Sequence, residues 1–342
     1  MKKEVAILGA TGMVGQRFVS LISDHPYFEV TSLYASERSK GKLYKDAARW
    51  VLETDIPEYA KNMPLKSFEN IDRIEEKIIF SALPAEVANT LEIELAKNGH
   101  FVFSNTASHR YDPFVPILIP EVNPEHLDAV KYQGTTGFIA TNANCSTTGL
   151  VIPLKALLNR FQIKNVFVVT MQAISGAGIN GLSAVQIHGN IIPYIEKEEE
   201  KIKIETNKIL GTFSEAGFAD KGLNMFVRTN RVPVREGHTE VVFVDVDAGI
   251  EEVKACFREF AGVPQELNLP TAPKNPVIVF DTVDRPQPML DVNKGKGMSV
   301  SVGRIQAEKG FLTFTLLSHN TIRGAAGGSV LNAELAYAKG LV

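Results

Sequence analysis

The sequence predicts an α/β protein of two domains, and three observations lead to that prediction. The chain of 342 residues exceeds the size at which a single hydrophobic core usually stops growing. Its first part alternates short apolar strands with helices, which predicts a parallel sheet. Its later part carries longer β-rich runs, which indicate a mostly antiparallel sheet covered by helices on one side, an α+β arrangement. We expect residues 1–145 to form the first domain, completed by a C-terminal helix over 320–342, and residues 146–319 to form the second.

Composition and charge exclude several classes of protein. A hydrophobic content of 44% with 22% charged residues is typical of a soluble globular chain. The net charge of −3 argues against a nucleic-acid partner, because proteins that bind nucleic acid are normally basic. The N-terminal apolar run is too short for a signal peptide, and no stretch approaches the ~20 apolar residues of a membrane span. We therefore expect a cytoplasmic protein without a membrane partner.

The N-terminus carries a glycine turn between a strand pattern over 4–8 and a helical repeat over 16–22. In that context, Gly9, Gly12 and Gly15 form a dinucleotide-binding fingerprint. Gly9 permits the turn, Gly12 lets the backbone approach the pyrophosphate, and Gly15 allows the helix to pack closely on the strand. The first domain is therefore predicted to be a Rossmann-type dinucleotide-binding domain. The residues of this turn expected to contact the cofactor are Gly9, Thr11, Gly12, Met13 and Val14.

The strand predicted over 29–34 should end beside the adenosine ribose of the dinucleotide. Ser36, Arg38 and Ser39 follow it, and these side chains are donors suited to a 2′-phosphate. Glu37 keeps NAD possible, since an acidic residue there can hold the ribose 2′-hydroxyl. The donors favour NADP as the cofactor.

Further strands are predicted over 77–84, 101–105, 116–120 and 137–141, with a helix over 85–98. Ser81 and Leu83 would lie at the carboxyl end of their strand, where open α/β sheets bind ligands, and we expect them at the cofactor. Residues 43–76, which include the only tryptophan, suggest no chemistry.

Two cysteines are too few for a disulfide scaffold and too far apart for a metal site, so no metal is expected. Cys256 falls on the apolar face of a helix and is interpreted as core. Cys145 follows a strand and begins a helix, with Ser146 and Thr147 as candidate caps and Pro153 expected within its first turns. A helix N-terminus favours the thiolate, which would make Cys145 a nucleophile; a small buried apolar residue is the alternative.

The second half offers partners for Cys145. His238 starts a strand beside two arginines and could be the base that meets Cys145 across a cleft. In the charged helix over 196–210, Glu205 and Lys208 share one face and could present an anion and a cation to that cleft, whereas the first charges are interpreted as solvated. The β-rich runs cover 165–174, 228–246, 276–281 and 298–317, with a hairpin turn at 308–310.

Seven stretches together resemble the aspartate-semialdehyde dehydrogenase family, in its archaeal and fungal-like branch, over nearly the whole chain. They cover residues 9–15, 104–110, 142–149, 171–178, 205–208, 231–238 and 319–327. A proline is common in the family where this chain has Ala143; the alanine keeps Asn144 and leaves the substrate assignment unchanged.

The resemblance implies a role for each site residue. Cys145 would be the acyl-enzyme nucleophile, His238 the general acid/base, and Gln172 a residue that holds the thioester. Arg231 would bind the substrate α-carboxylate and Glu205 its amine. The expected phosphate-binding residues are Arg110, Asn144 and Lys208, and the further cofactor-binding residues are Ser175, Gly176, Gly178 and Asn320.

The implied reaction is NADPH-dependent reductive dephosphorylation of 4-phospho-L-aspartate to L-aspartate 4-semialdehyde in lysine, threonine and methionine biosynthesis. A homodimer or homotetramer is the expected assembly. The nearest alternatives are a malonyl-CoA reductase or an N-acetyl-glutamyl-phosphate reductase of the same superfamily. An NADP-binding redox sensor, with Cys145 as the sensor, is the alternative outside enzymes.

Overall fold

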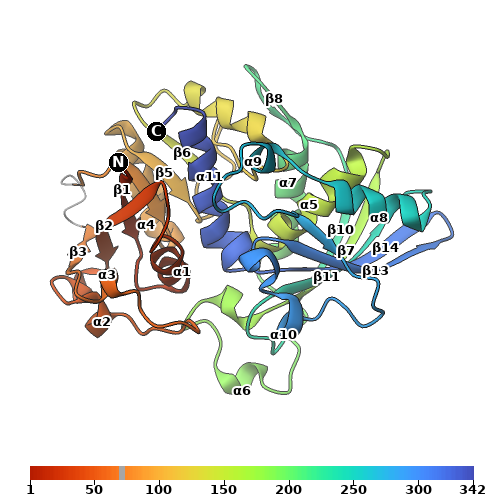
Figure 1. The fold of residues 1–342 in the computed structure, drawn as a ribbon, viewed down its shortest axis with the longest axis horizontal. Coiled ribbons are helices and arrows are strands. Elements are labelled where there is room, and N and C mark those ends of the chain that lie inside the picture. The colour runs from red at the N-terminus through yellow and green to blue at the C-terminus, as the bar shows by residue number, and fades with distance from the viewer. Residues whose placement is uncertain (69–73) are drawn as a thin grey trace.

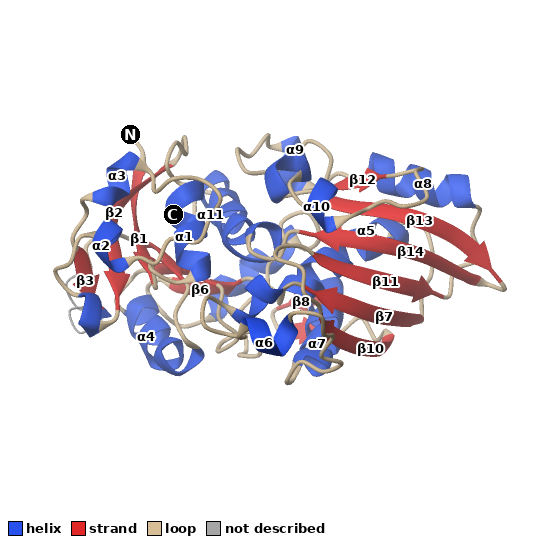
Figure 2. Ribbon diagram, turned by 90° about the horizontal axis from the view of Figure 1, so that it is seen from below, coloured by secondary structure: helices blue, strands red, loops and turns tan. Residues whose placement is uncertain are grey.

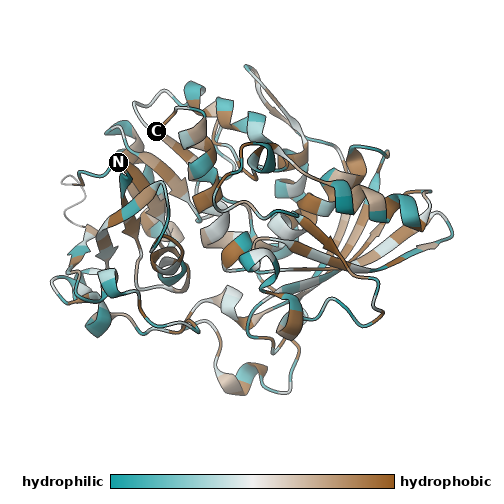
Figure 3. Ribbon diagram, in the orientation of Figure 1, coloured by the Kyte–Doolittle hydropathy of each residue, from teal (hydrophilic) through white to brown (hydrophobic). Residues whose placement is uncertain are grey.

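Two six-stranded sheets organise the chain, and the computed structural model describes residues 1–68 and 74–342 of it. The sheets lie at opposite ends of the molecule, with helices between and around them (Figure 1). Hydrophobic residues concentrate in the strands (Figure 3). Among the described residues, no helix has the length and apolarity needed to cross a membrane.

The first sheet is entirely parallel and has the order β3-β2-β1-β4-β5-β6. Its strands are β1 (Lys3–Leu8), β2 (Phe28–Ala35), β3 (Leu65–Ser67), β4 (Ile78–Ser81), β5 (Phe101–Ser104) and β6 (Phe138–Thr141). The strand order reverses at β1, which places a ligand site at its carboxyl end. The predicted Rossmann-type domain is confirmed.

Helices cover both faces of this sheet, as parallel sheets require. They are α1 (Met13–Leu21), α4 (Ala85–Lys97) and α11 (Gly327–Ala338), with short elements η1 (Glu37–Ser39), α2 (Tyr44–Ala47), α3 (Glu58–Lys61) and η3 (Pro124–Tyr132). The C-terminal helix α11 packs Val330 and Leu331 into the core beside α1. The end of the chain therefore returns to the first sheet.

The second sheet is mixed, with the order β10-β7-β11-β14-β13-β12 (Figure 2). Its central pairs are antiparallel, whereas β10 with β7 and β12 with β13 are parallel. The strands are β7 (Asn165–Gln172), β10 (Asn224–Arg231), β11 (His238–Val244), β12 (Val277–Val279), β13 (Val300–Glu308) and β14 (Phe311–Ser318). The predicted mostly antiparallel second sheet is confirmed.

Helices cover one face of the second sheet and share its core. They are α5 (Cys145–Leu158), α7 (Glu198–Leu210) and α8 (Ile250–Glu259). The remaining short elements are η4 (Ile174–Ala177), α6 (Ala184–Ile187), β8 (Thr212–Ser214), β9 (Gly217–Ala219), α9 (Val263–Glu266), α10 (Pro288–Asp291), η5 (Lys294–Gly297) and η6 (Ile322–Ala326). The opposite face of the sheet leaves Phe167, Phe226, Phe243 and Phe311 exposed.

Three local predictions were wrong. Residues 116–120 make a single β-bridge, at Ile117 with Thr141, because the prolines that bound the segment lack the N–H that a longer ladder needs. The N-cap of α5 is Asn144, whose side chain accepts from the amides of the two residues expected to cap it, Ser146 and Thr147. Pro153 lies inside α5, beyond its first turns.

Candidate active site

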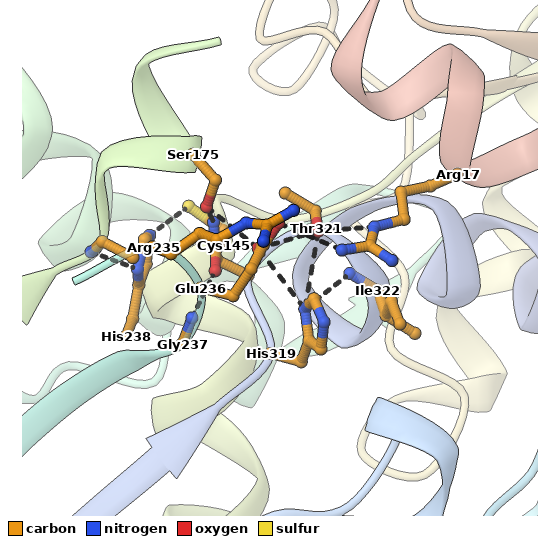
Figure 4. A network of polar contacts seen from close by, with 12 residues as sticks. Arg17, Cys145, Ser175, Arg235, Glu236, Gly237, His238, His319, Thr321 and Ile322 are labelled. Atoms are coloured by element: carbon orange, nitrogen blue, oxygen red, sulfur yellow. Dashed lines mark hydrogen bonds and ion pairs between the residues drawn. The ribbon is translucent and has the colours of Figure 1, made fainter. Parts of the chain in front are cut away.

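Two residues that lie far apart in the sequence, Cys145 and His238, are in contact at the junction of the two sheets. Cys145 is the first residue of α5, and Asn144 before it caps that helix. His238 is the first residue of β11, fully buried between β7 and β14. The sulfur of Cys145 lies 3.1 Å from Nε2 of His238. The structure therefore brings the predicted nucleophile and base into hydrogen-bond contact, as Figure 4 shows.

The other ring nitrogen of His238 fixes its tautomer. Nδ1 accepts a hydrogen bond of 3.0 Å from the backbone amide of Ala173. A nitrogen that accepts carries no proton, so we assign the proton of the neutral imidazole to Nε2, which faces Cys145. His238 thus stands as a hydrogen-bond donor to the sulfur.

Burial favours the neutral form of both groups. Protein atoms surround the Cys145 thiol although it is partly accessible, and this burial raises its pKa to about 12; Glu198 adds to the rise, while Arg231 and Arg110 oppose it. Burial lowers the pKa of His238 well below its usual value, and the charge on Arg231 adds to the effect. The amide of Ser146 at the helix N-terminus lowers the pKa of the thiol, in the expected direction, but desolvation of the thiol is the larger effect.

A cavity of about 440 Å³ opens at Cys145 between the two domains. Many of the expected site residues line it: Met13, Val14, Arg110, Asn144, Gln172, Ser175, Gly176, Gly178, Arg231 and Asn320. Residues that the sequence did not single out for the site also line it, among them Asn105, Glu198, Lys201, Thr321, Gly324 and Ala325. The cavity is therefore built from both domains and from the segment that precedes α11.

Glu205 and Lys208 do not reach this cavity. Glu205 is fully buried, where it accepts from Arg110 Nη1 at 2.9 Å and from the amide of Asn144 at 2.6 Å. Lys208 donates to the carbonyls of Arg110, at 2.7 Å, and Val115, at 2.9 Å, and burial lowers its pKa to about 8. The expectation that Glu205 and Lys208 contact the substrate directly is therefore wrong. Their hydrogen bonds place both side chains behind Arg110, whose position they hold.

The cavity-facing anion and cation on α7 are Glu198 and Lys201, which were predicted to be solvated. Glu198 is 7% exposed and accepts a short hydrogen bond from the side-chain amide of Asn144. The ammonium of Lys201 lies 3.8 Å from the Glu198 carboxylate. Glu198 and Lys201 have the same three-residue spacing as Glu205 and Lys208, seven residues earlier in the chain. This repeated Glu–Lys spacing was the sequence signal that could have revealed the cavity-facing pair.

Arg231 and Gln172 end neighbouring strands at the cavity. Arg231 is 7% exposed and donates to the carbonyl of Ala173 at 2.7 Å, which leaves the rest of its guanidinium for an anion. A Cβ on Gly176 would lie 2.8 Å from Arg231 Nη1 and 3.2 Å from a ring carbon of His238. Glycine at this position therefore lets the backbone approach both side chains.

The glycine turn after β1 fits a dinucleotide. A Cβ on Gly9 would lie 2.4 Å from the carbonyl oxygen of Ala82, and one on Gly15 would lie 2.1 Å from that of Gly9. The close helix–strand packing predicted for Gly15 is thus confirmed. The N-terminus of α1 lies at the cavity that Met13 and Val14 line, and helix N-termini stabilise a pyrophosphate.

The other expected cofactor residues lie outside the cavity lining, at or near the carboxyl edge of the first sheet. Ser36 and Arg38 are exposed in the turn after β2, and Ser39 is partly exposed. Ser81 and Leu83 are buried at the end of β4, and Thr11 and Gly12 lie in the turn before α1. Within residues 1–68 and 74–342, no cluster of histidine, cysteine and acidic side chains could hold a metal ion.

Comparison with known proteins identifies the family. Residues 4–130 match the semialdehyde dehydrogenase NAD binding domain, and residues 154–323 match the semialdehyde dehydrogenase dimerisation domain. The aspartate-semialdehyde dehydrogenase of Methanothermobacter thermautotrophicus is 45% identical over 97% of this chain and 98% of its own. This chain belongs to the aspartate-semialdehyde dehydrogenase family.

Other family members agree in sequence and in fold. The aspartate-semialdehyde dehydrogenase of Saccharomyces cerevisiae is 42% identical over 100% of this chain and 99% of its own. The crystal structure of the Candida albicans member with NADP superimposes with a TM-score of 0.92, at 40% identity and full coverage of both chains. The Vibrio cholerae aspartate semialdehyde dehydrogenase II gives a TM-score of 0.81 at 26% identity, with 99% of each chain covered.

Proposed function

We propose that this protein catalyses the NADP-dependent reductive dephosphorylation of 4-phospho-L-aspartate to L-aspartate 4-semialdehyde, and the reverse, through a thioester on Cys145. The contact of 3.1 Å between Cys145 and His238 carries the proposal, because it joins a nucleophile and a hydrogen-bond donor at a cavity beside a dinucleotide turn. The name shared by the relatives supports the aspartyl substrate. The product would enter lysine, threonine and methionine biosynthesis.

The charges around the cavity complement this substrate. We assign the substrate ammonium to Glu198 and its α-carboxylate to Arg231, whose planar fork suits a carboxylate. Arg110, Asn144 and Lys201 would bind the phosphate. The one ammonium and the two anionic groups of this small substrate are then each paired with protein charges, which fixes its reactive carbon against Cys145 and lowers the barrier to attack.

In the biosynthetic direction, the Cys145 sulfur forms a bond to the acyl carbon, the carbon–oxygen bond to phosphate breaks, and the thiol proton passes to the departing phosphate. Phosphate leaves toward Arg110 and Lys201, and Gln172 holds the thioester beside the cavity wall. NADPH, when bound, supplies the hydride that reduces the thioester carbon. The carbon–sulfur bond then breaks and the aldehyde is released, the departing thiolate accepts a hydrogen bond from His238 Nε2–H, and a solvent proton restores the thiol.

The cofactor would lie along the carboxyl edge of the first sheet. We place its pyrophosphate at the N-terminus of α1, with Gly9, Thr11 and Gly12 in the turn. Ser36, Arg38 and Ser39 would bind the 2′-phosphate, and Ser81 and Leu83 the middle of the dinucleotide. Around the nicotinamide we propose the cavity-lining residues Ser175, Gly176, Gly178 and Asn320.

We also propose that two copies associate through the open face of the second sheet. The match to a dimerisation domain supports a second copy as the occupant. On that face, Phe226 is 54% exposed and stacks on Phe167, with 4.6 Å between the ring centroids. The two rings form an exposed apolar surface, which is typical of a protein interface. Phe226→Arg should give monomers by light scattering, and an unchanged assembly would reject this face.

A free reactive thiol requires a reducing compartment, which favours the cytoplasm.

A paired assay tests the proposed function. Wild-type protein should oxidise NADPH with 4-phospho-L-aspartate and reduce NADP with aspartate semialdehyde and phosphate. Cys145→Ala should abolish both while NADP still binds by calorimetry, and the matched control Cys256→Ala should keep turnover because that thiol is buried in the helical layer. Turnover with malonyl-CoA but not with the aspartyl substrate would favour a malonyl-CoA reductase. NADP binding without turnover of either would favour a redox sensor.

A further inference from the structure

A buried carboxylate outside the active-site cavity joins three parts of the chain. Glu236 lies two residues before His238, in the loop between β10 and β11, and is 9% exposed. Its Oε1 accepts from Arg17 Nη2 at 3.0 Å. Its Oε2 accepts from the hydroxyls of Ser175, at 3.0 Å, and Thr321, at 3.1 Å. Figure 4 shows Glu236 among these side chains, beside Cys145 and His238.

Arg17 brings the cofactor helix into this network. It belongs to α1, whose first residues Met13 and Val14 line the active-site cavity. Its side chain is 11% exposed and also donates from Nε to the Thr321 hydroxyl at 3.1 Å. Any shift of α1 relative to the second domain would therefore move the cation that Glu236 binds.

Glu236 also belongs to a ring of contacts with Ser175, Asn320 and Gly237, and Gly237 directly precedes His238. Asn320 donates from Nδ2 to the Ser175 hydroxyl at 2.7 Å. Asn320 Oδ1 accepts from the amide of Gly237 at 2.8 Å, and Gly237 is bonded in the chain to both Glu236 and His238. The ring thus holds the backbone where β11 begins, and this fixes the position of the His238 imidazole.

We propose that Glu236 is a positioning residue that couples the cofactor helix, through Arg17, to the orientation of His238. It is bound to neither Cys145 nor His238 directly, so it acts on the reaction through the ring and the turn at Gly237. Seating the dinucleotide against α1 and aligning the imidazole with the sulfur are then one event. The proposal rests on the function proposed above, because its main readout is turnover.

Glu236→Gln tests the coupling, since it keeps the shape and removes the charge that holds Arg17. We expect kcat to fall about 10²-fold, the size of effect that a misplacement of about 1 Å can cause. The KM for aspartate semialdehyde should stay within about 3-fold, because the substrate-binding side chains are untouched. A variant with the wild-type kcat would overturn the proposal.

A cycle with His238 separates positioning from general damage. In a His238→Asn background, Glu236→Gln should lower kcat by less than about 2-fold, because the group it positions is already gone. Arg17→Gln, which cuts the same link from α1, should reproduce the loss in the wild-type background, and it also serves if Glu236→Gln does not fold. Multiplicative losses in the His238→Asn background would refute the coupling.

Glu53→Gln is the matched control, because it removes an exposed ion pair, 3.7 Å long, between the first domain and Arg235 in the same loop as Glu236. It should leave kcat unchanged. Alkylation of Cys145 by iodoacetamide gives a readout without turnover: Glu236→Gln should slow it about 10-fold at pH 8, because a displaced Nε2–H no longer stabilises the thiolate. If wild-type protein shows no turnover, the proposed function fails, and the alkylation rates alone decide this inference; equal rates would reject it.

Discussion

Nε2 of His238 lies 3.1 Å from the sulfur of Cys145 and carries the imidazole proton toward it. If the histidine took up the thiol proton, its Nδ1 would gain a hydrogen that faces the amide of Ala173. Burial already lowers the pKa of His238 strongly, so this charged state is disfavoured. His238 is therefore better suited to donate a hydrogen bond to the sulfur than to take up a second proton.

His238→Asn should lower kcat about 10²–10⁴-fold, the usual contribution of a positioned acid–base group. The KM for aspartate semialdehyde should change little, because Arg231 and Glu198 are left in place. Steady-state kinetics of His238→Asn and of the exposed control His188→Asn would measure this. A raised KM at unchanged kcat would mean that His238 only binds substrate.

Glu198 should control the reactivity of the thiol. A negative neighbour disfavours the thiolate and so raises the pKa of Cys145, which burial brings to about 12. Removing the charge in Glu198→Gln should lower that pKa and speed alkylation of Cys145 at pH 8, while the KM for aspartate semialdehyde rises because the ammonium loses its partner. In the wild-type protein, the alkylation rate of Cys145 should rise from pH 7 to pH 10 without a plateau, since this whole pH range lies below the pKa of the thiol.

The matched control for this prediction is Glu200→Gln, which removes an exposed carboxylate from the same helix. Its alkylation rate should equal that of the wild-type protein. A plateau of the wild-type rate near pH 8 would show that the thiol ionises far more readily than its burial implies, and would contradict the prediction.

Local chemistry made the centre of the site predictable from sequence. Cys145 follows a strand and begins a helix, and His238 begins a strand after two arginines, so both could be nominated from their neighbours. Their contact could not be, because it depends on how β11 pairs with β7 and β14. The alternation of strands and helices likewise predicted the first sheet, whereas proline chemistry broke the strand expected over 116–120.

The substrate side of α7 was misassigned for a geometric reason. Glu198 and Glu205 are seven residues apart, close to two helical turns, so they share a face and differ mainly by about 10 Å along the axis. Glu205 was expected to face a cleft, but it is fully buried where α7 packs against α5, and it accepts from Arg110. Periodicity identifies the face of a helix and gives no measure of which turn meets the cavity.

Arg38 should set the preference for NADP. It is exposed in the turn after β2 and can pair with a 2′-phosphate that NAD lacks. Arg38→Ala should raise the KM for NADP about 10–100-fold, as expected for loss of hydrogen bonds between charged groups worth about 1.5–3 kcal/mol, and leave the KM for NAD unchanged. Lys61→Ala, a cation lost from α3 of the same domain, is the control. Equal wild-type turnover with the two cofactors would reject this role of Arg38.

Gly324 should be indispensable because it forms the wall against the nucleophile. A Cβ at this position would lie 2.7 Å from Cβ of Cys145 and 2.8 Å from its Cα, closer than two carbon atoms can approach. Gly324 belongs to the π-turn of η6, and the backbone of the next residue, Ala325, departs from helical geometry. The segment is therefore already shaped to approach Cys145 and has little freedom to retreat.

Gly324→Ala should displace Cys145 from His238 and lower kcat about 10²-fold or more, with slower alkylation of the thiol in parallel. Gly249→Ala is the matched control, since its added Cβ meets no atom within 4 Å. Calorimetry should show that Gly324→Ala still binds NADP, because the glycine turn before α1 is untouched. Normal turnover in Gly324→Ala would mean that the segment before α11 yields to the added methyl group, and that the wall against Cys145 is compliant rather than fixed.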